Sequence, residues 1–167
     1  MNFKNKVIVI TGASSGIGEA SAIKFAKKNA KIVLVARRKE KLLQLQKKLV
    51  KFTDSTLVCQ CDVSNKTQVK EMTDIVLDTF GRIDVLINNA GFVIYGKVSE
   101  LSIEEIESQM ETNYFGMIYC TKNFLPHMIE QGRGHIVNVA SVGASLGFQV
   151  LPHIVQLNLL CSVFQKD

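Results

Sequence analysis

The chain has 167 residues, of which 47% are apolar, as expected for one globular domain with a sizeable core. Its net charge of +5 comes largely from basic residues between Lys24 and Lys51; because these recur at helical spacing, we interpret them as solvated helix surface and exclude a nucleic-acid partner. The apolar stretch 150–164 is too short to span a bilayer, no signal peptide precedes Val7, and the four cysteines lack zinc spacing. We therefore expect a cytoplasmic protein without membrane or metal partner.

Short apolar runs alternate with helical patterns along the chain. We predict strands over 6–11, 32–36, 56–61, 84–88 and 134–140. We predict helices over 16–29, 39–52, 66–80, 103–111 and 113–131. The strand cores are almost continuously apolar, which is typical of parallel strands buried on both faces. The pattern predicts one doubly wound α/β domain over residues 1–148, with its ligand beyond the carboxyl ends of the strands.

A glycine-rich turn follows the first predicted strand, with the sequence Thr-Gly-Ala-Ser-Ser-Gly-Ile-Gly from Thr11 to Gly18. Glycine permits a tight turn and close approach of a ligand, and the N-terminus of the next helix offers unpaired N–H groups to an anion. An ordinary turn could hold the same glycines, but strand, turn and helix in this order predict a phosphate cradle. The residues expected to bind cofactor here are Gly12, Ser14, Ser15, Gly16, Ile17 and Gly18. The helix is expected to bury Ala20, Ile23, Phe25 and Ala26.

Polar residues also follow the second predicted strand. An acid commonly stands there to bind the 2′-hydroxyl of a ribose, whereas this chain has Ala36, Arg37 and Arg38. Arginine suits a 2′-phosphate, so Arg37 and Arg38 favour NADP(H) over NAD(H). The alternative is that both arginines merely begin a basic helix.

Three further strand ends complete the pattern. Asp62 and Val63 follow the third strand, Asn88-Asn89-Ala90-Gly91 follows the fourth, and Ser141 ends the fifth, while Asn113 lies between the last two helices. With the Gly-x-x-x-Gly-x-Gly turn and in this order, the segments resemble the short-chain dehydrogenase/reductase family over residues 4–148.

The resemblance implies a Rossmann-type doubly wound parallel sheet of strand order 3-2-1-4-5. It also implies hydride transfer between NADP(H) and a small carbonyl or secondary alcohol. The complete family member from which this chain would derive, called the parent protein below, is expected to be homo-oligomeric. Asp62 and Val63 would lie near the adenine, and Asn89, Ala90 and Gly91 would tie strand ends and leave room for the cofactor. Asn113 would hold a helix kink and a water of the proton relay, and Ser141 would bind the oxygen of the substrate. Taken singly, Asn113 could be a helix cap and Ser141 a turn residue.

The chain departs from the family after Ser141. The family uses a tyrosine as general acid/base and a lysine four residues later. Here Ile154 stands thirteen residues after Ser141, at a common tyrosine position, and Asn158 stands where the lysine would follow. The tail from His153 can be back-translated in a shifted frame to Tyr-Cys-Ala-Thr-Lys-Phe-Ala-Leu. We interpret this as a frameshift between about residues 148 and 153, which makes residues 149–167 an aberrant tail.

On this interpretation the chain is a truncated and inactive form, with the sheet incomplete at its C-terminal side. Two other readings of the sequence stay open. One is a non-catalytic NADP(H)-binding module, and the other is an epimerase or dehydratase of the extended branch of the family. The Asn-Asn-Ala-Gly turn favours the short, reductive branch.

Overall fold

The computed structural model describes residues 2–97 and 99–140. Strands and helices alternate through this part of the chain. The elements are β1 (Val7–Thr11), α1 (Gly16–Ala26), β2 (Lys31–Ala36), α2 (Lys39–Leu49), β3 (Thr56–Gln60), α3 (Lys66–Phe80), β4 (Val85–Asn88), α4 (Ile103–Met110), the π-helical segment η1 (Glu111–Phe115), α5 (Gly116–Glu130) and β5 (His135–Asn138).

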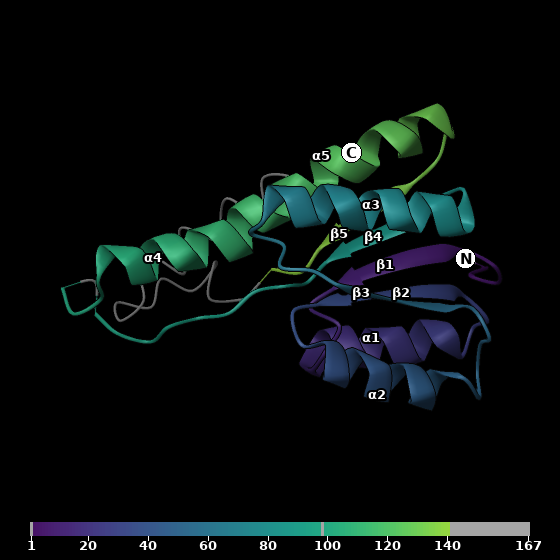
Figure 1. Ribbon diagram of the computed structural model, residues 1–167, viewed down its shortest axis with the longest axis horizontal. Helices are drawn as coiled ribbons and strands as arrows, with labels where there is room; N and C mark the ends of the chain where they lie inside the picture. The colour runs from purple at the N-terminus through teal and green to yellow at the C-terminus, as the bar shows by residue number, and fades with distance from the viewer. Residues whose placement is uncertain (1, 98, 141–167) are drawn as a thin grey trace.

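The five strands form one parallel sheet in the order β3-β2-β1-β4-β5, which confirms the predicted topology. Helices α1 and α2 cover one face of the sheet, and α3 and α5 cover the other (Figure 1). Helix α4 extends away from the sheet beyond α5 (Figure 1). After β3 the chain crosses back and places β4 beside β1, so the strand order reverses between β1 and β4. This is where such sheets leave a crevice for ligands.

Alternate residues of the strands build two apolar layers. Val7 and Val9 of β1 pack with the α3–α5 side, whereas Ile8 and Ile10 pack with the α1–α2 side. All four are fully buried, which is why the strand is apolar throughout and not alternating. Phe124 of α5 is fully buried in the first layer.

Several element ends differ from the predictions. Helix α1 ends at Ala26 because Asn29 turns the chain with a left-handed φ of 57°. It buries Ala22 and not Ala20, which is exposed. The first three residues of the predicted helix 113–131 belong to η1, so α5 starts at Gly116. Helices α3 and α4 begin at their sequence-predicted places, with side-chain caps from Asn65 and Ser102.

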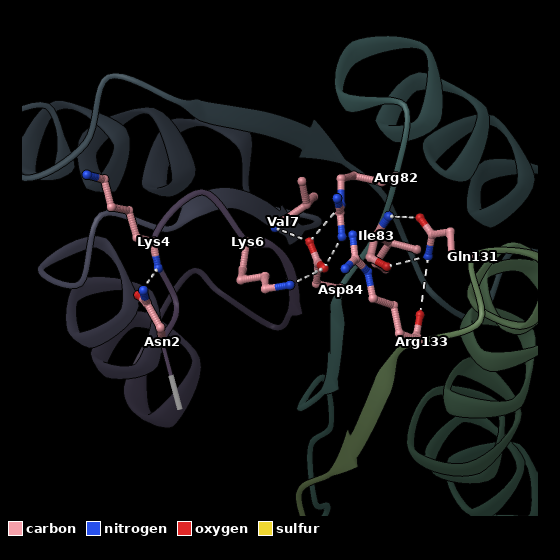
Figure 2. A network of polar contacts seen from close by, with 9 residues as sticks. All are labelled: Asn2, Lys4, Lys6, Val7, Arg82, Ile83, Asp84, Gln131 and Arg133. Atoms are coloured by element: carbon pink, nitrogen blue, oxygen red, sulfur yellow. Dashed lines mark hydrogen bonds and ion pairs between the residues drawn. The ribbon is translucent and has the colours of Figure 1, made fainter.

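A polar network fixes the amino end of β4 (Figure 2). Asp84 is 5% exposed, accepts from Val7 N at 3.0 Å and pairs with Lys6 and Arg82. Burial by itself raises the pKa of Asp84, but the hydrogen bonds from Arg82, Val7 and Lys6 outweigh it, so the net shift is downward. One residue earlier, Gln131 bonds both the N–H and the carbonyl of Ile83, at 3.1 and 2.8 Å. These contacts tie β4 to β1 and to the end of α5.

Candidate nucleotide-binding site

A cavity of about 380 Å³ opens at the carboxyl ends of the strands. All of the predicted cofactor residues except Gly16 and Gly18 line it, so residues far apart in sequence meet at one edge of the sheet. Its lining consists of Gly12, Ser14, Ser15, Ile17, Ala36, Arg37, Arg38, Cys61, Asp62, Val63, Asn89, Ala90, Gly91, Phe92 and Thr112.

The glycine loop owes its shape to its three glycines. Gly12 and Gly16 adopt left-handed φ values of 66° and 57°, which side chains rarely tolerate. Gly18 is limited by space instead, because a Cβ there would collide with the carbonyl oxygen of Gly12 and lie 2.7 Å from Asn89 Nδ2. Gly16 and Gly18 therefore shape the loop without lining the cavity.

Asparagine side chains join the ends of neighbouring strands. Asn89 Nδ2 donates to the carbonyl oxygen of Thr11 at 3.0 Å, and Asn88 Nδ2 donates to Asn138 Oδ1 at 2.9 Å. Thr11 Oγ1 accepts from the N–H groups of Asn89 and Ala90, at 2.9 and 3.0 Å. These bonds link β1 to β4 and β4 to β5, as the resemblance implied for this turn.

The two arginines after β2 take different positions. Arg38 Nη2 donates to Ser14 Oγ at 2.9 Å and to Ser15 Oγ at 3.0 Å, so its guanidinium lies against the glycine loop. Arg37 extends toward Asp62, with 3.9 Å between Nη1 and Oδ2, and its side chain is 65% exposed. The arrangement puts two positive charges at the cavity edge that carries Ala36 in place of an acid.

The turn after β3 holds Asp62 in place. Asp62 Oδ1 accepts from the N–H of Ser64 at 3.1 Å and from its hydroxyl at 2.8 Å, and Asp62 N donates to Gln68 Oε1 at 2.8 Å. The adjoining Cys61 lines the cavity but is only 1% exposed.

The described cysteines are free and buried. Burial raises the pKa of Cys59 to about 11, and burial with nearby negative charge raises the pKa of Cys61 and of Cys120 to about 12. Such thiols stay protonated at neutral pH and pack as small apolar groups.

Asn113 lies in the middle of η1 and is not a helix cap. Its Oδ1 accepts from Phe92 N at 2.9 Å and its Nδ2 donates to Phe92 O at 2.8 Å. A π-helical turn interrupts the helix at this point, in keeping with the expected kink, and such turns are frequent at functional sites. Ser141, Ile154 and Asn158 lie outside the described residues.

Sequence reasoning missed three kinds of site residue. Phe92 and Thr112 line the cavity without belonging to a motif. Thr11 begins the glycine motif, and its place at a strand end could have marked it as a link between strands. Gln109 is buried beneath residues 92–94 and stands in a helix with no local signal that distinguishes it from its polar neighbours.

The residues present fit a dinucleotide. Gly12 and Gly18 pack closely against Ala90 and Asn89, helix α1 begins within the glycine loop, and arginines stand at one side of the cavity. A parallel sheet with this order, with a glycine loop at its switch point, defines the class of Rossmann-type nucleotide-binding proteins.

Comparison with known proteins narrows the class to a family. Residues 6–153 match the short chain dehydrogenase family, and the chain belongs to it. An uncharacterized oxidoreductase of Staphylococcus aureus strain USA300 is 41% identical over 146 residues, which cover 87% of this chain and 61% of that protein. The chain thus spans about 61% of the length of this relative.

Solved structures agree with this assignment. A short-chain dehydrogenase/reductase from Burkholderia phymatum in complex with NAD superposes with a TM-score of 0.93 and 32% identity, covering 98% of this chain and 58% of that chain. A short-chain dehydrogenase from Streptomyces avermitilis gives a TM-score of 0.89 and 31% identity, covering 98% and 59%.

The described residues offer neither a membrane-spanning helix nor a metal cluster. None of the helices in this part of the chain is both long and apolar enough to cross a bilayer. Over the same residues, no group of three or more His, Cys, Asp or Glu side chains could hold a metal ion.

Proposed function

We propose that this chain is the nucleotide-binding part of an NADP(H)-preferring oxidoreductase that acts on a small carbonyl or secondary alcohol. One observation carries the cofactor choice: the Arg38 guanidinium lies on the hydroxyls of Ser14 and Ser15 at the cavity edge where Ala36 replaces an acid. A guanidinium held there is preorganised to donate to a 2′-phosphate. The sequence pointed to both arginines, and the geometry supports Arg38 as the direct contact.

Arg37 has a second role in this proposal. It reaches toward Asp62, and both residues line the same side of the cavity. The pair would flank the adenine, with the carboxylate of Asp62 accepting a hydrogen bond from its amino group. Arg37 would add positive charge near the 2′-phosphate without direct contact.

The bound nicotinamide would supply hydride transfer. In the parent protein, Ser141 would hold the oxygen of the substrate, and Asn113 would support the proton relay through the helix kink that it stabilises. A tyrosine and a lysine would move the proton at that oxygen. Ile154 and Asn158 have no group able to do so.

We therefore propose that this chain binds nucleotide without catalysing reduction, because residues 149–167 are encoded out of frame. The family match ends at residue 153, so Ile154 and Asn158 lie beyond it. The second candidate function, a nucleotide-binding module that never catalysed, is favoured by the same missing tyrosine and lysine. We further propose a cytoplasmic location and a homo-oligomeric parent protein.

Titration of the purified 167-residue chain with NADPH and NADH tests the cofactor assignment. NADH is the appropriate comparison because the Burkholderia neighbour contains NAD. We expect tighter binding of NADPH by nucleotide fluorescence or calorimetry. Equal affinities, or a preference for NADH, would refute the assignment.

A further inference from the structure

A buried glutamine supports the wall of the nucleotide cavity. Gln109 belongs to α4 and is only 1% exposed, although its amide is strongly polar. A buried amide without partners is costly, so its hydrogen bonds indicate what it does. Gln109 Oε1 accepts from Ile94 N at 2.9 Å, and Gln109 Nε2 donates to Glu105 O at 3.2 Å. The two partners fix the orientation of the amide, because an N–H needs an acceptor and a carbonyl needs a donor.

Gln109 and Asn113 act on the same segment. They stand four residues apart, on successive turns, and bind the backbone of Ile94 and Phe92 respectively. Residues 92–94 belong to neither a helix nor a strand. Side-chain amides from α4 and η1 thus hold this segment in the way a neighbouring strand would.

The held segment forms one end of the cavity. Gly91 and Phe92 line it on the β4 side, whereas Ala36 to Arg38 and Cys61 to Val63 line it on the β2–β3 side. Because β1 stands between these strands in the sheet, the two groups occupy opposite ends. A dinucleotide spans both ends, but an adenosine fragment such as 2′,5′-ADP needs only the β2–β3 end.

We propose that Gln109 is a positioning residue for the β4 end of the cavity. Its amide holds residues 92–94 against α4 and so determines the affinity for the nicotinamide half of the dinucleotide. Without it, the half-buried N–H of Ile94 would have to move toward water to find a partner, and Phe92 would move with it. The inference rests on the proposed function, since it assumes that the cavity takes a dinucleotide.

The experiment uses the full chain with Gln109→Met, which keeps the length of the side chain and removes both hydrogen bonds. Gln131→Met is the matched control: the side chain of Gln131 also accepts from a backbone N–H, that of Ile83, and donates to backbone carbonyls, those of Ile83 and Arg133, but it lies at the amino end of β4 (Figure 2). Calorimetry measures binding of NADP⁺ and of 2′,5′-ADP. Hydrogen exchange measures protection of the Ile94 amide without any ligand.

We expect Gln109→Met to weaken NADP⁺ binding about tenfold, the factor for loss of one net hydrogen bond, and to leave 2′,5′-ADP binding unchanged. Exchange at Ile94 should become faster, and Gln131→Met should change neither affinity. Should Gln109→Met fail to fold, the shorter Gln109→Asn cannot reach Ile94 and should give the same contrast.

Three results would overturn the inference: unchanged exchange at Ile94, unchanged NADP⁺ affinity, or an equal loss for both ligands. A wild-type chain that binds neither ligand would overturn the proposed function, and with it this role for Gln109. The hydrogen-exchange result separates the two failures, because it reports on residues 92–94 in the absence of nucleotide.

Discussion

Thr11 and Asn89 are joined by hydrogen bonds in both their backbone and their side chains. Asn89 N donates to Thr11 Oγ1 at 2.9 Å, and Asn89 Nδ2 donates to Thr11 O at 3.0 Å. Thr11 is the last residue of β1, and Asn89 directly follows β4. The pair therefore links the carboxyl ends of these two neighbouring strands, at the point where the strand order reverses. The glycine loop starts at the next residue, and its position therefore depends on this link.

Gly18→Ala should abolish nucleotide binding. The added methyl group would collide with the Gly12 carbonyl oxygen and lie 2.7 Å from Asn89 Nδ2, which displaces both the loop and the Thr11–Asn89 link. Gly81→Ala is the matched control, because Gly81 has a left-handed φ of 67° at the end of α3 with open space around it. It should lower the free energy of unfolding by about 1–2 kcal/mol and leave binding intact. Calorimetric titration of NADPH checks both, and retained binding by Gly18→Ala would contradict the proposed role of the loop.

Arg38→Ala should reduce the affinity for NADPH more than Arg37→Ala does. A charge-assisted contact with a 2′-phosphate is worth about 1.5–3 kcal/mol, and Arg38 is the arginine held against Ser14 and Ser15. NADH affinity should change little in Arg38→Ala, because NADH lacks that phosphate. Parallel titrations with both cofactors measure the contrast. A larger loss of NADPH affinity with Arg37→Ala would contradict the assignment of Arg38 as the direct contact.

Asp84→Asn should destabilise the fold at neutral pH by about 2–3 kcal/mol, since it removes a carboxylate bonded by Lys6, Arg82 and Val7 N. The pKa of Asp84 is lowered from 3.8 in the folded chain, so its stabilisation is present above that value. It is lost as the pH falls through the lower, folded-state pKa. Urea unfolding of the wild-type chain and of Asp84→Asn from pH 7 down to pH 3 should therefore show a difference in the free energy of unfolding that narrows below about pH 4.

Asp74→Asn provides the control for that series. Asp74 pairs with Lys70 on the exposed side of α3, at 2.6 Å, where water screens the charges. Asp74→Asn should therefore change the free energy of unfolding little at every pH. A gap for Asp84→Asn that stayed constant below pH 4 would mean that the charge of Asp84 does not stabilise the fold.

Cys59, Cys61 and Cys120 should resist alkylation in the folded chain. Their pKa values lie at about 11, 12 and 12, so almost no thiolate exists at pH 7.5, and all three are buried. Iodoacetamide labelling followed by peptide mass spectrometry measures each position separately. Labelling should appear in urea, and rapid modification of Cys61 without denaturant would show that the cavity exposes its sulfur.

Restoration of the reading frame after about residue 148 should create a carbonyl reductase. We expect the 167-residue chain to show no NADPH-dependent reduction of aldehydes or ketones, because loss of general acid/base catalysis costs about 10²–10⁴-fold. Ile154→Tyr with Asn158→Lys should not rescue it, because the surrounding sequence stays out of frame. The frame-restored protein should turn over, and its tyrosine-to-phenylalanine variant should not. Stop codons soon after Asp167 in every forward frame would refute the frameshift. The non-catalytic nucleotide-binding module would then be the favoured function.

Local sequence was enough to predict the architecture. The apolar runs at β1 and β2 are buried on both faces, and this requirement fixes their composition whatever surrounds them. Glycine at positions 12 and 16 reflects backbone angles that few other residues adopt, so the loop was also predictable. Both signals come from residues close together in the chain.

Only the tertiary structure decided how the site is supported. Arg37 and Arg38 are adjacent and chemically identical, yet one lies on the glycine loop and the other extends toward Asp62. Gln109 is buried and accepts a hydrogen bond from Ile94 N, although nothing near it in sequence distinguishes it from an exposed helical glutamine. These roles depend on partners 15 or more residues away, as for Gln109 with Ile94, and hydrophobic periodicity carries no information about such pairs.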